Sequence, residues 1–352
     1  MCLRAEPLPA RQVRAGYEFR CRPATISTAQ LDNLAAVLQL LNGGRGPDLL
    51  GVCEVETREL AVALANRVRP GDYAVAHVDS PDLRGIDTSL IYSQQHFECV
   101  GVTPHLVHLR FRTRDIFEVE LRVKANGARL FVLVNHWPSR RNQGAVASEP
   151  FRISVAGHCG RIVDSILKFS RQEVTSFRDS AAAMRRIADR WDRNILVMGD
   201  FNDEPFARSV MDELGAVNSV DLLEEEFKKS SQRAYLPDVA SYLKRNAALF
   251  NYAWEQIGVS DLGTSFFAEP DVYRTKRLFD QIMGSRGIFY GLSGLRVALQ
   301  SFAVFAPRLM WTNQRTVATD LCRVRPRAFD REKKTGFSDH FPVTCVLETR
   351  SR

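Results

Sequence analysis

The sequence predicts one layered domain of the α/β or α+β class. Helix-like and strand-like segments, some of them paired as hairpins, alternate along the chain, and no linker rich in proline, glycine or serine divides it. Of the 352 residues, 45% are hydrophobic and 25% are charged, which is typical of a globular protein and excludes wholesale disorder, collagen and a coiled coil. No apolar run approaches the ~18–20 residues of a membrane span, so we expect no transmembrane segment.

The helices are predicted from apolar residues that recur every three or four positions. Thr28–Leu41 shows this pattern, with Ser27 or Thr28 available as its N-cap and two glycines after its end. Further helices are predicted at Arg58–Val68, Phe151–Phe169, Phe177–Trp191 and Pro205–Leu214.

The strands are predicted from short apolar runs and from alternation of apolar and polar residues. His105–Arg112 and Phe117–Val123 both alternate and are separated by a turn, which predicts a hairpin. The other predicted strands are Leu49–Cys53, Tyr73–Val78, Thr88–Tyr92, Arg129–Val134, Ile195–Met198, Phe279–Met283, Val297–Phe302 and Val343–Leu347.

The N-terminal segment, residues 1–26, is predicted to be irregular, and residues 27–350 to form the folded domain. Met1–Arg22 has no apolar core of ~7–15 residues and no small-residue cleavage site, so it does not read as a secretory signal. We therefore expect a cytoplasmic protein. Only Tyr17–Phe19 resembles a strand before the first helix, which suggests that the gene start is truncated.

The chain is basic, with 48 Lys and Arg residues against 41 acidic ones and a net charge of +7. A modest positive excess fits an anionic partner such as nucleic acid, phospholipid or a phosphorylated metabolite, and a solvated basic surface fits equally well. The seven cysteines lack the spacing of a zinc site and predict reduced thiols. Nothing in the sequence predicts an obligate protein partner.

Polar residues gather next to four predicted strands, where loops present functional groups. They are Glu54, which follows a strand directly, and three segments: NHWPS at residues 135–139, GDFND at residues 199–203 and SDHFP at residues 338–342. Each segment alone has an ordinary explanation. Asp200 could form an Asx turn, and Asp339 could form a surface pair with His340. His136 could be a core histidine, and Glu54 a charged residue at the end of a strand. Four independent segments of this kind are hard to produce by chance.

In this order the segments resemble the endonuclease/exonuclease/phosphatase superfamily, whose fold is DNase I-like, and they look most like its bacterial members. The resemblance implies a four-layer αββα sandwich of two packed sheets with helices outside and a cleft at one edge. The matching pieces are residues 47–56 (PDLLGVCEVE), Arg84–Asp87, NHWPS, residues 199–205 (GDFNDEP), Leu278–Ile282 and SDHFP.

Two departures from the family pattern stand out. Members normally begin with a strand that ends in an asparagine, and no such strand precedes Thr28, so the domain is expected to lack its first strand. Gln281 stands where members often carry His or Tyr, and we expect it to alter packing more than chemistry. Arg84 and Asp87 fit the family's strand entry or an ordinary surface ion pair, and Thr264 is expected to form a structural turn.

A phosphodiester is anionic, so its hydrolysis calls for a hard divalent cation, and all-oxygen ligands suit Mg²⁺ or Mn²⁺ better than zinc. Glu54 is the expected first ligand, and Asp339 is expected to reach the same ion or a second one. Asp200 would align or deprotonate the attacking water, while Asn202 would orient it or donate to a phosphate oxygen.

The remaining roles concern the histidines and the basic loop. His340 and Asp280 are expected to form a dyad in which the carboxylate favours the cationic imidazole, and the histidine could act as base or as charge stabiliser. His136 would donate to phosphate or protonate the leaving oxygen. Substrate-binding residues are expected at Asn135, Arg140 and Arg141, although a solvated basic loop would explain the two arginines equally well.

These expectations describe a Mg²⁺-dependent phosphoesterase, and the basic charge favours a nuclease acting on DNA or RNA. A phospholipid or inositol-phosphate substrate is the enzymatic alternative. The absent first strand leaves a third hypothesis, a catalytically inactive binding scaffold, against which the joint presence of the site residues speaks.

Overall fold

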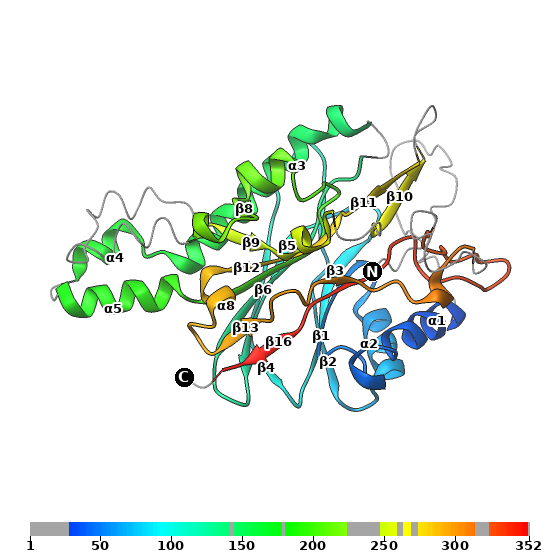
Figure 1. The fold of residues 1–352 in the computed structure, drawn as a ribbon, viewed down its shortest axis with the longest axis horizontal. Coiled ribbons are helices and arrows are strands. Elements are labelled where there is room, and N and C mark those ends of the chain that lie inside the picture. The colour runs from blue at the N-terminus through cyan, green and yellow to red at the C-terminus, as the bar shows by residue number, and fades with distance from the viewer. Residues whose placement is uncertain are drawn as a thin grey trace, which may run out of the picture.

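The computed structural model describes residues 28–140, 144–177, 180–223, 247–258, 263–268, 274–313 and 324–350. Two β-sheets are stacked face to face, and helices cover the outer face of each (Figure 1). The predicted four-layer αββα arrangement is therefore confirmed. Arg141 and the segment before Thr28 lie outside the described residues, so the expectation of a missing first strand stays a prediction.

The large sheet has seven strands in the order β4-β5-β6-β7-β12-β9-β8. Its neighbours pair antiparallel except for β6 with β7 and β8 with β9, which are parallel. The strands are β4 (Phe97–His105), β5 (Ile116–Val123), β6 (Arg129–His136), β7 (Asn194–Asp200), β8 (Ala216–Val217), β9 (Leu249–Asn251) and β12 (Asp280–Ser285).

The small sheet has the antiparallel order β1-β3-β2, and within the described residues β1 pairs with β3 alone. Its strands are β1 (Leu49–Val55), β2 (Tyr73–His77) and β3 (Asp87–Ser93). Three two-stranded ladders complete the β-structure: β10 (Ser265–Ala268) with β11 (Arg274–Arg277), β13 (Leu295–Val297) with β16 (Leu347–Thr349), and β14 (Ala303–Val304) with β15 (Val343–Thr344).

The outer layers are helical. Helices α1 (Thr28–Leu38) and α2 (Arg58–Val68) pack against the small sheet. Thr57 is the N-cap residue of α2, and its hydroxyl accepts a hydrogen bond from Leu60 N. The large sheet is covered mainly by α3 (Gly144–Leu167), and α4 (Arg171–Ser176) and α5 (Ser180–Trp191) extend this layer. Shorter helices are η1 (Asn42–Gly44), η2 (Ser209–Glu213), η3 (Tyr252–Gln256), α8 (Arg286–Tyr290) and η4 (Arg308–Met310).

Three apolar clusters fill the spaces between these four layers. Even-numbered residues of β6, such as Leu130 and Val132, enter the cluster between the two sheets. Odd-numbered residues, such as Phe131 and Leu133, pack under α3. A third cluster joins the small sheet to its two helices. Because side chains alternate along a strand, the parity of a residue in β6 decides which layer it faces.

One predicted strand is wrong. The partner of β5 in the hairpin is Phe97–His105, and His105–Arg112 is not a strand beyond its first residue. The physical reason is that β5 already has β4 on one edge and β6 on the other, so no edge remains for residues 106–112. Leu106 and Phe111 are exposed in a loop instead, while Val107 is buried under α3.

Several helix and strand bounds also differ from the prediction. The predicted helix Phe177–Trp191 is present as α5 but begins at Ser180, and the unpredicted helix α4 precedes it, started by a capping box of Ser170 and Glu173. The predicted helix at Pro205–Leu214 is reduced to η2, and the predicted strand Val297–Phe302 ends at Val297. The predicted strand Val343–Leu347 is divided between β15 and β16.

Two further observations bear on sequence-based expectations. The cysteines within the described part of the chain, Cys53, Cys99, Cys159 and Cys345, form no disulfide, as expected for reduced thiols. None of the described helices combines the length and the apolar character that crossing a membrane would need.

Gly199, the first residue of GDFND, is required where β7 passes β6. Its φ of +136° is rarely adopted by other residues, and a Cβ placed there would lie 1.9 Å from the carbonyl oxygen of Asn135. Asn135 and Gly199 are register partners in the parallel ladder. No side chain can therefore be accommodated without moving one strand away from the other.

We predict that Gly199→Ala lowers the free energy of unfolding by about 2–4 kcal/mol, through backbone strain and overpacking. Urea denaturation followed by circular dichroism measures this. Gly157→Ala is the matched control, because a Cβ there has only ordinary contacts at 3.6 Å on a helix, where alanine is favoured over glycine. Equal stability of the two variants would contradict the prediction.

Candidate active site

Three neighbouring strands of the large sheet align polar side chains in one row. His136 at the end of β6 is the register partner of Asp200 at the end of β7, and Asp200 is the partner of Asp280 at the start of β12. All three have the parity of the residues that face the small sheet, such as Val134, Met198 and Ile282. Pairing and alternation together therefore place them side by side on the inter-sheet face.

Glu54 comes to this row from the small sheet. It is the extra residue of a β-bulge in β1, where the register shifts between Cys53 and Val55, and its φ is +58°. A bulge re-aims a side chain, and a non-glycine residue in the left-handed region is strained and often functional. The Glu54 carboxylate lies 3.9 Å from His136 Nε2 and is buried to 7% exposure.

His136 lies between two carboxylates. Its Nε2 is also 3.7 Å from Asp200 Oδ2, while its buried Nδ1 has no hydrogen-bond partner. Burial, together with the charges of Arg114 and Arg84, lowers the pKa of His136 well below its ordinary value. The imidazole is therefore neutral at physiological pH, with one ring nitrogen as donor and the other as acceptor.

His340 has the opposite charge state. Its Nδ1 donates a 2.7 Å hydrogen bond to Asp280 Oδ2, which confirms the predicted contact between these two residues. Burial alone would lower the pKa of His340, but the Asp280 carboxylate raises it to about 10. The same pair holds the pKa of Asp280 below its ordinary value despite burial. His340 is therefore a buried cation.

Asp200 is the most readily protonated carboxylate of the row. Burial raises its pKa to about 6, and the negative charge of Asp280 adds to this effect against the attraction of His340. Asp200 is thus ionised at neutral pH but basic enough to accept a proton.

Asn202 is held against Asp200 in a tight turn. Its backbone N–H donates to Asp200 Oδ1 at 2.8 Å, and its side-chain amide donates to Asp200 Oδ2 and to the carbonyl of Trp137. Its φ of +49° is again left-handed. The ordinary Asx turn is therefore present, and it fixes the amide beside the reactive carboxylate.

Thr264 ties the two halves of the dyad together. Its hydroxyl accepts hydrogen bonds from the backbone N–H groups of Phe279 and Asp280, and its carbonyl accepts one from Phe341 N. The neighbouring Ser265 forms a β-bridge with His340. The structural role expected of Thr264 is confirmed.

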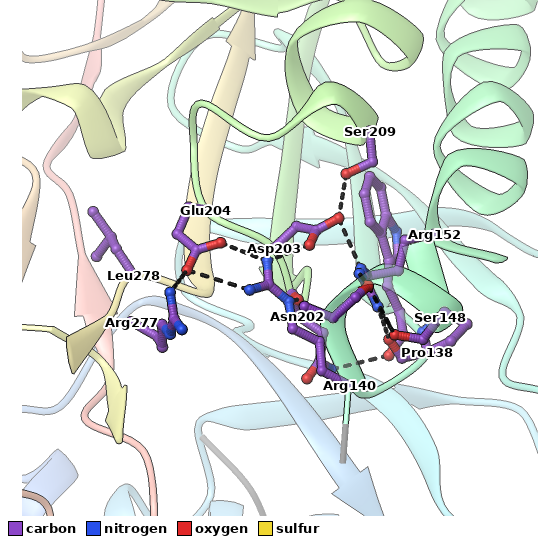
Figure 2. Close-up of polar contacts among 12 residues, drawn as sticks. Pro138, Arg140, Ser148, Arg152, Asn202, Asp203, Glu204, Ser209, Arg277 and Leu278 are labelled. Carbon is purple, nitrogen blue, oxygen red and sulfur yellow. Dashed lines mark hydrogen bonds and ion pairs between the residues drawn. The ribbon is translucent and has the colours of Figure 1, made fainter. Parts of the chain in front are cut away.

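Arg140, expected to bind a substrate phosphate, directs its guanidinium into the protein (Figure 2). It donates to the carbonyl of Asn202 and forms ion pairs with Asp203 and Glu204, and it lies over the ring of Phe279. These contacts favour a positioning role for Arg140 on the GDFND loop.

Asp203 is the acid on which this network depends. It pairs with Arg140 and, at 2.8 Å, with Arg152 of α3, whose side chain is 1% exposed (Figure 2). Arg152 also donates to Ser148 and to the carbonyls of Pro138 and Ala145. The sequence carried a signal for it, since Arg152 stands on the apolar stripe of the predicted helix that includes Val155.

A second buried arginine was also missed by sequence reasoning. Arg114 donates to the carbonyls of His136 and Trp137 and pairs with Asp82. Asp82 also binds Arg84, so the surface pair anticipated between Arg84 and Asp87 is formed with a different partner. Asp87 instead accepts a hydrogen bond from Ser80 N.

Three further residues named in the sequence analysis lie around the row. Asn135 and Gln281 face the α3 side of the sheet, where Asn135 accepts from Trp137 Nε1 and Gln281 donates to the carbonyl of Asp203. Both side chains are fully buried. Asp339 is partly buried beside His340, and its role as a metal ligand stays a prediction.

The comparison with known proteins decides the family. The profile of the Endonuclease/Exonuclease/phosphatase family matches residues 24–260. The chain belongs to this family. Its members are hydrolases of phosphoester bonds and generally use divalent metal ions, so the chain is an enzyme of this class. No curated protein sequence matches it significantly.

Solved structures of similar fold share little sequence with this family member. Truncated TDP2 from Caenorhabditis elegans is 15% identical, with 90% of this chain and 89% of that chain covered and a TM-score of 0.46. The mannosyl-6-phosphatase Bt3783 of Bacteroides thetaiotaomicron is 14% identical, with 91% and 90% covered and a TM-score of 0.48. An endonuclease/exonuclease/phosphatase from Bacteroides vulgatus is 13% identical, with 92% and 91% covered and a TM-score of 0.49.

The site residues fit the divalent ion that the family uses. Glu54 offers a carboxylate oxygen 3.9 Å from His136 Nε2, and the strained bulge directs it to the row. Hard oxygen donors are the ligands that Mg²⁺ and Mn²⁺ prefer. An ion held there would neutralise charge on a bound phosphoryl group.

We predict that Asp203→Ala destabilises the protein by about 3–5 kcal/mol, because it leaves the buried guanidinium of Arg152 without its acid. Urea denaturation measures the change. Asp212→Ala, at an acid whose side chain is 69% exposed, is the matched control and is expected to cost less than about 1 kcal/mol. A loss below 1 kcal/mol for Asp203→Ala would refute the structural role of this network.

Proposed function

We propose that this chain is a Mg²⁺- or Mn²⁺-dependent phosphodiesterase that cleaves nucleic acid. The observation that carries the proposal is the buried row of His136, Asp200 and Asp280 with Glu54 facing it from the other sheet. With His340 hydrogen-bonded to Asp280, this arrangement combines a general base, a cationic histidine and carboxylates for a hard cation. We also propose a cytoplasmic location, because the proposed substrate is an intracellular nucleic acid.

The roles follow from the charge states. Asp200, with a pKa near 6, aligns the attacking water and accepts its proton, while Asn202 orients it. As the water oxygen bonds to phosphorus, the bond to the leaving oxygen breaks and that oxygen takes up a proton from solvent. His136, which keeps one ring nitrogen as donor, hydrogen-bonds the phosphate or leaving oxygen.

His340 serves as the charge stabiliser in this scheme. With a pKa of about 10 it is protonated at neutral pH and cannot act as a base, but it can stabilise negative charge that develops on the phosphoryl oxygens. Asp280 holds it in this state. Glu54, and Asp339 beside His340, are the residues proposed to hold the metal ion.

Nucleic acid is favoured as substrate by charge. The chain carries a net charge of +7, and Arg84, Arg112 and Arg114 lie together beside Pro138 and Ser139, directly after His136. Arginine side chains commonly contact phosphates and so position a nucleic-acid backbone. Hydrolysis of a phospholipid or an inositol phosphate would use the same catalytic groups, whereas a binding scaffold would not need these groups.

We expect Asp200→Asn and His340→Ala each to reduce kcat by about 10²–10⁴-fold, because each removes a group that acts in the transition state. Hydrolysis of a fluorescent oligonucleotide in Mn²⁺ measures this. The matched controls are Asp212→Asn and His96→Ala, which change exposed residues of the same type. Near-normal turnover by Asp200→Asn or His340→Ala would remove the assigned site.

Metal dependence is tested separately. EDTA is expected to abolish hydrolysis and Mg²⁺ or Mn²⁺ to restore it, and Glu54→Gln is expected to raise the metal concentration for half-maximal activity at least about tenfold. Activity that is indifferent to EDTA would rule out the metal role.

Substrate class is tested with plasmid DNA, RNA, sphingomyelin vesicles and inositol phosphates. For nucleic acid, affinity is expected to fall at least about tenfold between 50 and 200 mM salt, because bound cations are released from the backbone. A preference for vesicles, or binding that is flat with salt, would favour the alternative substrates.

A further inference from the structure

A pocket of about 280 Å³ opens beside the catalytic row. Its walls come from three places: the loop before β3 with Leu83 and Arg84, the loop before β5 with Phe111 and Arg112, and Phe151 on α3. Pro138 and Ser139, which follow His136 in the chain, line it too. The pocket therefore adjoins the segment that carries the catalytic histidine.

The pocket shares its support with the catalytic site. Arg114, on the pocket wall and 5% exposed, donates to the carbonyls of His136 and Trp137. Besides burial, the charges of Arg114 and Arg84 also lower the pKa of His136. The charge of a ligand in the pocket would consequently interact with the charge of the proposed scissile phosphate.

Its lining combines apolar side chains and three arginines with Asp82, which pairs with Arg84 and Arg114. Leu83 is 72% exposed and Phe111 is 40% exposed, although both are large apolar residues. Phe111 meets Phe151 edge to face at 5.0 Å, which steadies its ring and leaves part of it open to solvent. Arg84 and Arg112 stand on the same pocket. Core packing does not account for this exposed apolar surface.

A ligand that matches this lining has a planar apolar part joined to a phosphate. A nucleotide has both, because its base can stack on Phe111 while its phosphate faces the arginines. An inositol phosphate has no apolar part, and the two acyl chains of a lipid exceed a cavity of about 280 Å³ with cationic walls. A base that stacks on Phe111 in this pocket has left the stack of a duplex.

We propose that this pocket binds the unpaired base of a nucleotide next to the scissile phosphate, so that the enzyme acts on single-stranded or frayed nucleic acid. The inference rests on the proposed function and adds a subsite for one base, with Phe111 as its stacking platform and Leu83 at its rim.

The test uses fluorescein-labelled tetranucleotides in which a tetrahydrofuran abasic residue replaces one nucleotide at each position in turn. Binding is measured by fluorescence anisotropy in EDTA, and cleavage in Mn²⁺. At one position, removal of the base is expected to raise Kd and KM about tenfold for the wild type, the usual effect of losing one base–aromatic stack.

Phe111→Ala should reduce this base dependence to less than about twofold, whereas Phe111→Tyr should preserve it because the ring remains. Leu83→Ala, at a residue too exposed to support the core, should reduce it in part and guards against misfolding of Phe111→Ala. Leu299→Ala, an exposed leucine outside the pocket lining, is the matched control and should retain the full dependence.

The two levels of the proposal fail in different ways. Base-dependent binding without any metal-dependent cleavage would overturn the proposed function and leave the pocket assigned. Metal-dependent cleavage that is indifferent to every abasic substitution, or unchanged base dependence in Phe111→Ala, would overturn the pocket. It would also be overturned if Phe111→Ala lost affinity only for sphingomyelin vesicles.

Discussion

The register of β7 between β6 and β12 is the constraint on which the site depends. Parallel pairing on one side and antiparallel pairing on the other bring His136, Asp200 and Asp280 into one row. A slip of one residue in either ladder would turn a catalytic side chain toward α3. The close approach of Gly199 to the Asn135 carbonyl excludes a side chain at this position, so the first residue of GDFND supports the geometry of the second.

The same burial gives the two histidines opposite charges. His136 and His340 are both buried, but His340 has Asp280 at hydrogen-bond distance, whereas the arginines near His136 oppose its protonation. Two identical side chains are thereby specialised, one as a neutral hydrogen-bonding group and the other as a fixed cation. Burial raises the pKa of Asp200 to about 6, and His340 opposes this effect while Asp280 adds to it.

Sequence reasoning reached the features that are local. Periodicity located most of β1, β6, β7 and β12, and the motifs gave every residue of the catalytic row. It failed where tertiary pairing decides: residues 106–112 alternate like a strand, yet β5 has no free edge for them, and Phe111 and Arg112 line the pocket instead. No local pattern reveals that Arg140 pairs with Asp203 and Glu204.

The residues missed from the sequence explain how the chain after β6 is held. Arg114 binds the carbonyls of residues 136 and 137, and Arg152 that of residue 138, while Asp82 and Asp203 balance their charges. A guanidinium suits this task better than an ammonium, because its five donors in a fixed plane can serve carbonyls and a carboxylate together. Arg114 also lines the pocket. One side chain therefore supports the segment of the catalytic histidine and forms part of the wall of the proposed base subsite, so a movement of Arg114 would affect both.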